Sequence, residues 1–264
     1  MSEKIPLFQM PKLSYRVFKI WFRNKDVFMK TYKTNFLPSL LEPILYLVAF
    51  GLGLGGFVQT INGEHYVNFI APAIVTVSMM YSAFYECTYA SFVRMYFQKT
   101  FDAIIATPVN IEEVITGEIL WGATKSLINS SIVLAVITAA GLVSSPLFLL
   151  VPLVAFLVGF LFAAIAMCFT AIVPNIDAFN YPAFLFITPM SLLSGTFFPL
   201  TAMPQIVQTI AHIVFPLTNA VTITRALTLG IIETSILFSL AWMLIIAPIF
   251  FIIAISLMKK RLIK

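Results

Sequence analysis

Charged side chains are scarce in this sequence, and their scarcity is the first indication of its class. They make up 10% of the 264 residues, whereas an ordinary soluble domain has about 25%. The mean hydropathy is correspondingly high, at +0.99. This composition excludes an ordinary soluble domain and predicts an all-α integral membrane protein. We expect a single transmembrane domain over residues 1–264, with neither a separate soluble domain nor a cleavable signal peptide.

Cysteine and histidine are also few, and their placement excludes several kinds of chemistry. Cys87 and Cys168 lie in apolar segments, and His65 and His212 are isolated. No spacing among them predicts a disulfide framework or a metal site. The sequence also lacks a phosphate-binding loop of the form G-x-x-x-x-G-K-[ST]. We therefore expect no catalytic residue, cofactor site or metal site in this chain, and any energy for its work has to come from another protein.

Long apolar runs are abundant, and they predict six membrane-spanning helices. Each run is near the roughly 20 residues that a bilayer core requires. A further apolar region, residues 200–230, is divided into shorter stretches by prolines, so we expect outer re-entrant helices between the fifth and sixth spans. The predicted spans are residues 35–57, 66–92, 111–142, 147–173, 179–198 and 232–257.

Lysine and arginine are clustered, and their distribution predicts the orientation of the chain. Eight of the sixteen lie between Lys4 and Lys33, and four lie in the last six positions. The positive-inside rule places both termini and the loop after the second span on the cytoplasmic side of the cell (inner) membrane. In residues 12–30, basic side chains recur opposite an apolar face, which predicts an amphipathic helix in the membrane interface. We expect membrane lipid as a partner, and no nucleic acid.

The loop between the second and third predicted spans is a polar segment between two apolar ones. Its apolar side chains fall on one face of a predicted helix of about three turns, residues 96–108, which ends near Pro108. Asn110 is expected to cap the next helix, with Glu113 as its reciprocal partner. We interpret the aromatic residues as anchors for a partner protein, and a helix that rests on the lipid surface is the alternative. The predicted interface consists of Phe97, Gln98, Lys99, Thr100, Phe101, Asp102, Ile104, Ile105, Thr107 and Pro108.

Polar side chains also occur inside the predicted spans, where they are costly and must face the protein interior. Two uses remain open. Buried pairs, such as Lys125 with Glu86 or Glu118, would hold helices together, or the polar side chains would line a substrate route. The candidate residues are Glu42, Ser82, Tyr85, Glu86, Tyr89, Glu118, Lys125, Asn129, Thr188, Ser191 and Ser194.

Several stretches, taken together, resemble the permease subunits of type-2 ABC exporters, and in particular the nodulation-type lipo-oligosaccharide export permeases. The resemblance implies a homodimer of six-span subunits, each bound to a separate cytoplasmic ABC ATPase that holds ATP and Mg²⁺. It assigns the ATPase-coupling helix to residues 96–108, the interfacial helix to residues 12–30 and the outer re-entrant helices to residues 200–229. The stretches that carry it, in order along nearly the whole chain, are residues 35–46, 84–89, 96–102, 106–108, 117–121 and 193–199.

The function expected from this resemblance is ATP-driven export, and the chain itself is expected not to be an enzyme. The substrate would be a lipid-linked sugar, a polysaccharide or another amphipathic molecule, taken from the cytoplasm or the inner leaflet. An ion- or proton-driven carrier, with Glu42, Glu86, Glu118 and Lys125 as a relay, is an alternative that the lack of an internal repeat counts against. A non-transporting membrane anchor of an ATPase complex is a further alternative.

Overall fold

The computed structural model describes residues 11–32, 41, 44–53, 55, 60–61 and 64–263. Helices dominate these residues, as expected for apolar segments that must satisfy their backbone hydrogen bonds internally. A short antiparallel strand pair, β1 (Thr60–Ile61) and β2 (Glu64–His65), precedes the first long helix, and a π-helical turn, Ala49–Gly53, lies before it. The predicted all-α membrane fold is therefore confirmed apart from this two-residue strand pair.

Four helices among the described residues are long and apolar enough to cross a membrane. The helix α3 (Tyr66–Tyr85) continues through π-helical turns at Glu86–Ala90 and Val93–Phe97. The other three are α5 (Ile111–Ala139), α6 (Val151–Ile172) with a preceding 3₁₀ turn, Pro146–Leu150, and α11 (Ser235–Leu262). A fifth span results if α9 (Gln205–Val214) and α10 (Pro216–Leu229), which meet at a bend of 92°, are taken as one.

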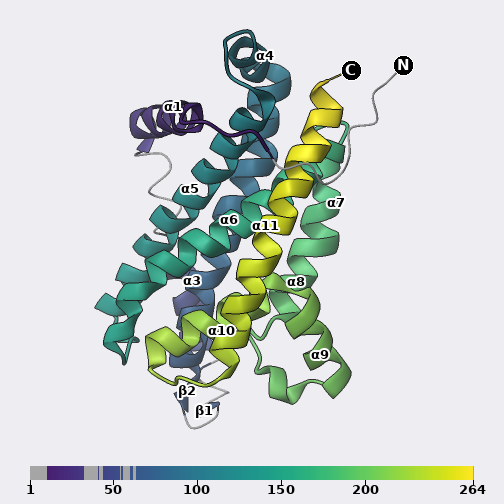
Figure 1. The fold of residues 1–264 in the computed structure, drawn as a ribbon. Helices are drawn as coiled ribbons and strands as arrows, with labels where there is room; N and C mark the ends of the chain where they lie inside the picture. Colours follow the sequence, from purple (N-terminus) through teal and green to yellow (C-terminus); the bar gives the residue numbers. More distant parts are fainter. Residues whose placement is uncertain are drawn as a thin grey trace.

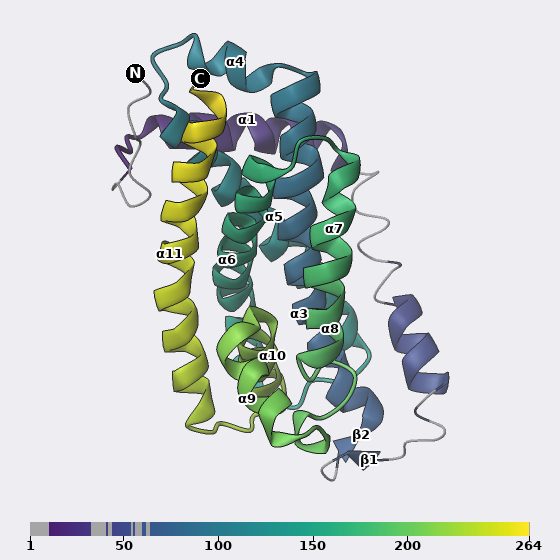
Figure 2. The ribbon, with the colours of Figure 1, turned by 90° about the vertical axis from the view of Figure 1, so that its right-hand side faces the viewer.

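The count of six spans is not reproduced among the described residues. Eleven of the 23 residues of the predicted first span, 35–57, lie outside them. The predicted fifth span is a succession of short pieces that follows a 3₁₀ turn, Asp177–Phe179. These pieces are α7 (Asn180–Pro182), a π-helical turn (Ala183–Ile187) and α8 (Thr188–Leu193). They nevertheless form one column along the length of the molecule (Figures 1 and 2).

The two ends of the helical bundle carry different elements. One end of the bundle carries α1 (Arg16–Lys30), α4 (Thr100–Ile105) and the C-terminal end of α11 (Figures 1 and 2). At the opposite end lie α9, α10, the strand pair and a 3₁₀ turn, Leu200–Ala202 (Figure 2). The elements α1 and α11, which carry eight of the sixteen basic residues, therefore bring these residues to one end of the molecule.

Small residues allow the central helices to pack closely. A Cβ atom added to Gly159 of α6 would lie 2.5 Å from the Cβ of Ser126 on α5. A Cβ atom added to Gly117 of α5 would lie 2.6 Å from the Cβ of Ile20 on α1. Such close approach between helices is typical of membrane proteins, where small residues let backbones come together. Gly117 thus positions α1 directly against the bundle.

Candidate functional site: a charged and aromatic cavity

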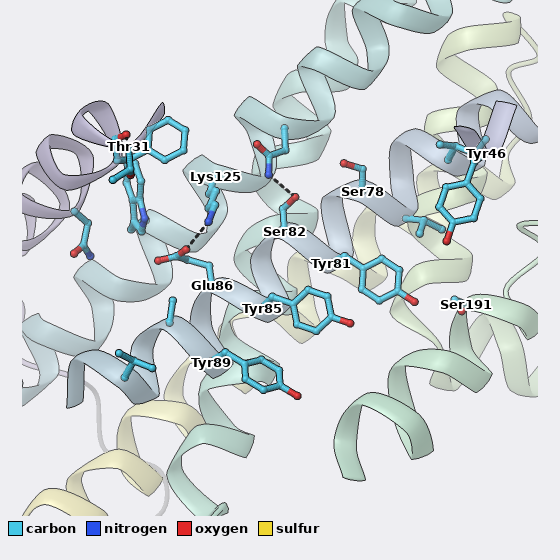
Figure 3. Close-up of a pocket in the computed structure, with 18 of the residues that line it drawn as sticks. Thr31, Tyr46, Ser78, Tyr81, Ser82, Tyr85, Glu86, Tyr89, Lys125 and Ser191 are labelled. Atoms are coloured by element: carbon cyan, nitrogen blue, oxygen red, sulfur yellow. Dashed lines mark hydrogen bonds and ion pairs between the residues drawn. The ribbon is translucent and has the colours of Figure 1, made fainter. Parts of the chain in front are cut away.

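A cavity of about 1050 Å³ lies between α1, α3, α5 and α8. Its lining contains charged and amide side chains, a row of tyrosines and several aliphatic residues. The close-up places Thr31 and Lys125 toward one end of the cavity, and Tyr46 and Ser191 toward the other (Figure 3). The first end is the one that α1 covers.

An ion-pair network joins α3 to α5 at the α1-covered end. Glu86 accepts from Lys125 Nζ at 2.8 Å and from Arg94 Nη1 at 2.8 Å. Arg94 also bonds Glu118, with its Nε 2.9 Å from Oε2. Glu86 and Arg94 each lie in one of the two π-helical turns that extend α3, and such turns occur frequently at functional sites.

Glu118 is the buried centre of this network. Its side chain is 0% exposed, and it accepts from Ser91 Oγ at 2.6 Å and from Asn24 Nδ2 at 2.8 Å. Asn24 belongs to α1, so the hydrogen bond fixes that helix to the bundle. Arg23 precedes it, and the Arg23 Nη1 atom is shielded from water without a hydrogen-bond partner among the described residues. Burial lowers the pKa of Arg23, and the Glu118 carboxylate opposes this effect.

Three tyrosines follow one face of the α3 column, one helical turn apart. The rings of Tyr81 and Tyr85 stack with centroids 5.4 Å apart, and Tyr85 lies 5.8 Å from Tyr89. All three rings project to the same side in the close-up (Figure 3). Near this row, the charge of Glu86 is paired with those of Arg94 and Lys125. Asn129 Nδ2 also donates to Ser82 Oγ at 2.9 Å. The row offers aromatic faces and hydroxyl groups to the cavity.

The candidate polar residues chosen from the sequence are only partly brought together. Glu118 lies behind the cavity wall, and Glu42 lies outside the described residues. Thr188 donates to the Ala183 carbonyl at 3.1 Å, and Ser194 is buried without a hydrogen-bond partner among the described residues. Those that line the cavity are Ser82, Tyr85, Glu86, Tyr89, Lys125, Asn129 and Ser191.

Sequence reasoning missed Arg23, Asn24 and Arg94 as members of this site. Asn24 carried a usable signal, because it follows Val17 and Ile20 on the stripe of α1 that the structure buries. A polar residue on a buried apolar stripe indicates a specific partner. Arg94 served only as an indicator of orientation, and nothing local distinguishes it from a surface arginine.

The predicted helix over residues 96–108 is wrong in length. Only α4, Thr100–Ile105, is α-helical, because Lys99 adopts a left-handed conformation with φ of 53° and separates it from the α3 extension. Phe101 is 0% exposed and belongs to the hydrophobic core, so it is not an outward anchor as predicted. Phe97 is 61% exposed. Of the remaining interface residues, Gln98, Lys99, Asp102, Thr107 and Pro108 are exposed, and Thr100, Ile104 and Ile105 are half-buried.

The turn after α4 is bound to both ends of the chain. The predicted capping box of Asn110 and Glu113 is confirmed, with Asn110 N donating to Glu113 at 2.9 Å. Glu113 also accepts from Ser14 just before α1. Glu112 pairs with Lys259 of α11 at 2.6 Å and accepts from the Lys12 backbone N–H. We call the contacts of Glu112 and Glu113 with Lys12, Ser14 and Lys259 the end clasp.

At the opposite end of the bundle, Arg225 joins three elements. It lies on α10, with its guanidinium 3.9 Å from the centre of the Phe69 ring of α3. It donates to the Phe69 carbonyl and, at 3.0 Å, to the carbonyl of Gly195 just after α8. These contacts close this end of the bundle around α3 and α8.

Long apolar helices around a polar cavity define a multi-pass membrane protein. Its apolar helices span the bilayer and do not merely lie on its surface. Sequence comparison identifies the family: the chain belongs to the ABC-2 type transporters, whose family pattern matches residues 15–229. The resemblance seen in the sequence is thereby confirmed, and the family is one of transport permeases.

Curated relatives match along nearly the whole chain. Nodulation protein J of Sinorhizobium fredii is 32% identical over 253 residues, which cover 96% of each chain. Nodulation protein J of Rhizobium meliloti is 31% identical over 260 residues and 98% of each chain. The inner membrane transport permease YadH of Escherichia coli is 24% identical, covering 91% of this chain and 93% of its own. No solved structure matches the chain.

Proposed function

We propose that this chain is the membrane-spanning subunit of an ATP-driven exporter, which moves an amphipathic substrate such as a lipid-linked sugar out of the cytoplasm or inner leaflet. One observation carries the proposal. The cavity is walled by α3 and α5, and these two helices flank residues 97–108, the largely exposed segment around α4 that we call the α4 turn. A force applied at α4 therefore acts directly on two walls of the cavity.

The α4 turn is built to transmit displacement. The buried Phe101 ring fixes it to the hydrophobic core, and the capping box of Asn110 and Glu113 fixes the following turn to α5. In the proposed mechanism, ATP binding closes the partner ATPases and α4 moves with them. This movement opens or closes the cavity to its surroundings. The nucleotide shifts this equilibrium only through different affinities for the two states.

A separate cytoplasmic ABC ATPase is the proposed partner, and ATP and Mg²⁺ belong to it. Its docking site is the exposed surface of the α4 turn, centred on Phe97 and Asp102. An exposed aromatic residue is a common anchor in protein interfaces. Family membership supports an ATPase partner, and the exposure of Phe97 supports this position for the contact.

We also propose six spans, a homodimer and cytoplasmic termini. Residues 35–57 and 179–198 would supply the first and fifth spans, and the 92° bend between α9 and α10 suits a re-entrant pair. The common location of α1, α4 and the C-terminal end of α11 supports one cytoplasmic end, because α1 and α11 carry eight of the sixteen basic residues and Lys99 directly precedes α4.

A proton- or ion-driven carrier receives less support from the geometry. Glu86 and Glu118 are bound to Arg94, and Glu86 also to Lys125. Ion pairs therefore occupy both carboxylates, and a relay through them would first have to break these contacts, which is costly for buried pairs. The same contacts suit a role in holding the cavity walls in place.

Copurification with the partner ATPase, followed by ATPase measurements in vesicles, tests the proposal. Phe97→Ala with Asp102→Ala should lower transport-coupled ATPase activity at least several-fold, without loss of membrane insertion. A matched control is Phe238→Ala with Asp26→Ala, which removes another exposed phenylalanine and another exposed aspartate away from α4. Wild-type coupling in the first double variant, or an equal loss in the control, would overturn the docking assignment.

A further inference from the structure

The α1-covered end of the cavity carries more positive than negative charge. Among the described residues that line it, the charged ones are Arg23, Arg94 and Lys125 against Glu86. A second carboxylate, Glu118, lies behind the wall and is fully buried. Even with Glu118 included, three cations face two carboxylates.

The hydrogen bonds show which cation is in excess. Glu86 binds both Lys125 and Arg94 at 2.8 Å, and Arg94 also binds Glu118. Arg23 takes no part in these ion pairs, and its Nη1 atom is shielded from water with no hydrogen-bond partner among the described residues. An arginine remains charged in proteins. A partly buried guanidinium that forms no ion pair among the described residues is unfavourable, so an anion in the cavity beside it would stabilise the site.

The surroundings of Arg23 favour an amphiphile over a free ion. The row of Tyr81, Tyr85 and Tyr89 leads from the charged end toward Tyr46 (Figure 3). Ile70, Ile74 and Val77 continue the lining with aliphatic surface. A cavity of about 1050 Å³ has room for a headgroup and part of a chain. The cavity is thus charged at one end and aromatic to aliphatic along its length.

We propose that this cavity binds the anionic headgroup of an amphiphile, a phosphate or sulfate ester, with Arg23 as the main contact and the tyrosine row along the body of the molecule. A guanidinium matches such oxygens in geometry and in charge. The proposal deepens the proposed function and rests on it for the transport of the ligand. The binding of the headgroup depends only on the cavity and not on the proposed function.

Competition for a photoreactive alkyl phosphate tests the binding. The purified chain is placed in phosphatidylcholine nanodiscs, labelled, and its modified peptides are identified by mass spectrometry. Label should appear on the α3 and α5 peptides that line the cavity. Dodecyl phosphate should compete about tenfold better than dodecylphosphocholine, which has the same chain but no net charge, since hydrogen bonds to charged groups are the strong ones. Equal competition by the two, or label confined to other segments, would overturn the proposal.

Variants of α1 assign the preference to Arg23. Arg23→Gln should abolish the preference for dodecyl phosphate, and Arg23→Lys, which keeps the charge, should retain it. The matched control is Lys19→Gln, which removes an exposed cation from the same helix and should leave the preference intact. If Arg23→Gln does not fold, the wild-type competition and the Arg23→Lys variant still test whether the cavity prefers the anionic headgroup. An unchanged preference in folded Arg23→Gln would contradict the role of Arg23.

A final arm identifies the source of the anion. In the complex with its ATPase, dodecyl phosphate should stimulate ATP hydrolysis in wild type and not in Arg23→Gln, as expected of a transported substrate. Binding without stimulation would support the headgroup site and assign it to a resident anionic lipid. Failure of any ATPase to associate would refute the proposed function and leave the binding result standing.

Discussion

Phe97 and Phe101 lie four residues apart in the chain, yet the fold gives them opposite surroundings. Phe97 is exposed and Phe101 is buried. We expect Phe101→Ala to lower the free energy of unfolding by about 3 kcal/mol or more, because it leaves a cavity in the core. Phe97→Ala removes an exposed ring and should change this free energy by no more than about 0.5 kcal/mol. Thermal unfolding of the purified variants measures both, and equal losses would contradict the assignment.

Among the residues that the structure describes, Arg94 pairs with two carboxylates, whereas Lys125 pairs with Glu86 alone. Removing one partner from a buried pair leaves an uncompensated charge and costs about 3–5 kcal/mol. Arg94→Gln, which leaves Glu118 without an ion-pair partner, should therefore destabilise the protein more than Lys125→Gln, which leaves both carboxylates bonded to Arg94. Thermal unfolding gives the ranking. Adding Glu118→Gln to Arg94→Gln should recover part of the loss, and a reversed ranking would show that the network is organised differently.

At the scale of elements, the end clasp joins α1, the turn after α4 and α11. Glu112→Gln should weaken the contact with Lys259 and loosen the C-terminal turns of α11. Hydrogen exchange of residues 255–263 should then become several-fold faster. Glu233→Gln, which changes an exposed carboxylate just before α11, is the matched control and should leave this exchange unchanged. Faster exchange in the control, or none in Glu112→Gln, would argue against the clasp.

The N-terminal helix α1 shows what a periodic pattern can and cannot predict. The spacing of basic and apolar residues correctly predicts a helix, and the structure has it as Arg16–Lys30. The pattern does not distinguish lipid from protein as the apolar partner. In the structure, Val17 and Ile20 are buried, and Asn24 bonds Glu118 of α5.

Residues 96–108 show a second limit. Periodicity predicts one helix over residues 96–108, but the chain turns at Lys99, whose left-handed backbone no local pattern indicates. The capping box of Asn110 and Glu113 is predicted correctly because its chemistry is local, within four consecutive residues. Local signals therefore predict helix starts better than helix continuity.

At the scale of the whole molecule, most of the candidate site depends on contacts between distant parts of the chain. Asn24 and Glu118 are 94 residues apart in sequence. Glu86 and Lys125 are 39 apart, and both lie in predicted spans, so their pairing was a natural hypothesis. The role of Arg23 and Arg94 depends on how α1 folds back over the bundle, which composition and spacing do not specify. Sequence therefore predicted the membrane class and several lining residues, but not the excess positive charge.

The most direct test of the account is whether a cytosolic ATPase holds the α4 turn. A photo-crosslinker attached to Asp102→Cys, in an active complex with its ATPase, should form a product with the ATPase whose yield changes with nucleotide. Native Cys87 and Cys168 are buried and should not interfere. Thr209→Cys on α9, exposed at the opposite end of the bundle, should form none. Crosslinking to the ATPase from position 209, or none from position 102 in a transport-competent complex, would contradict the account.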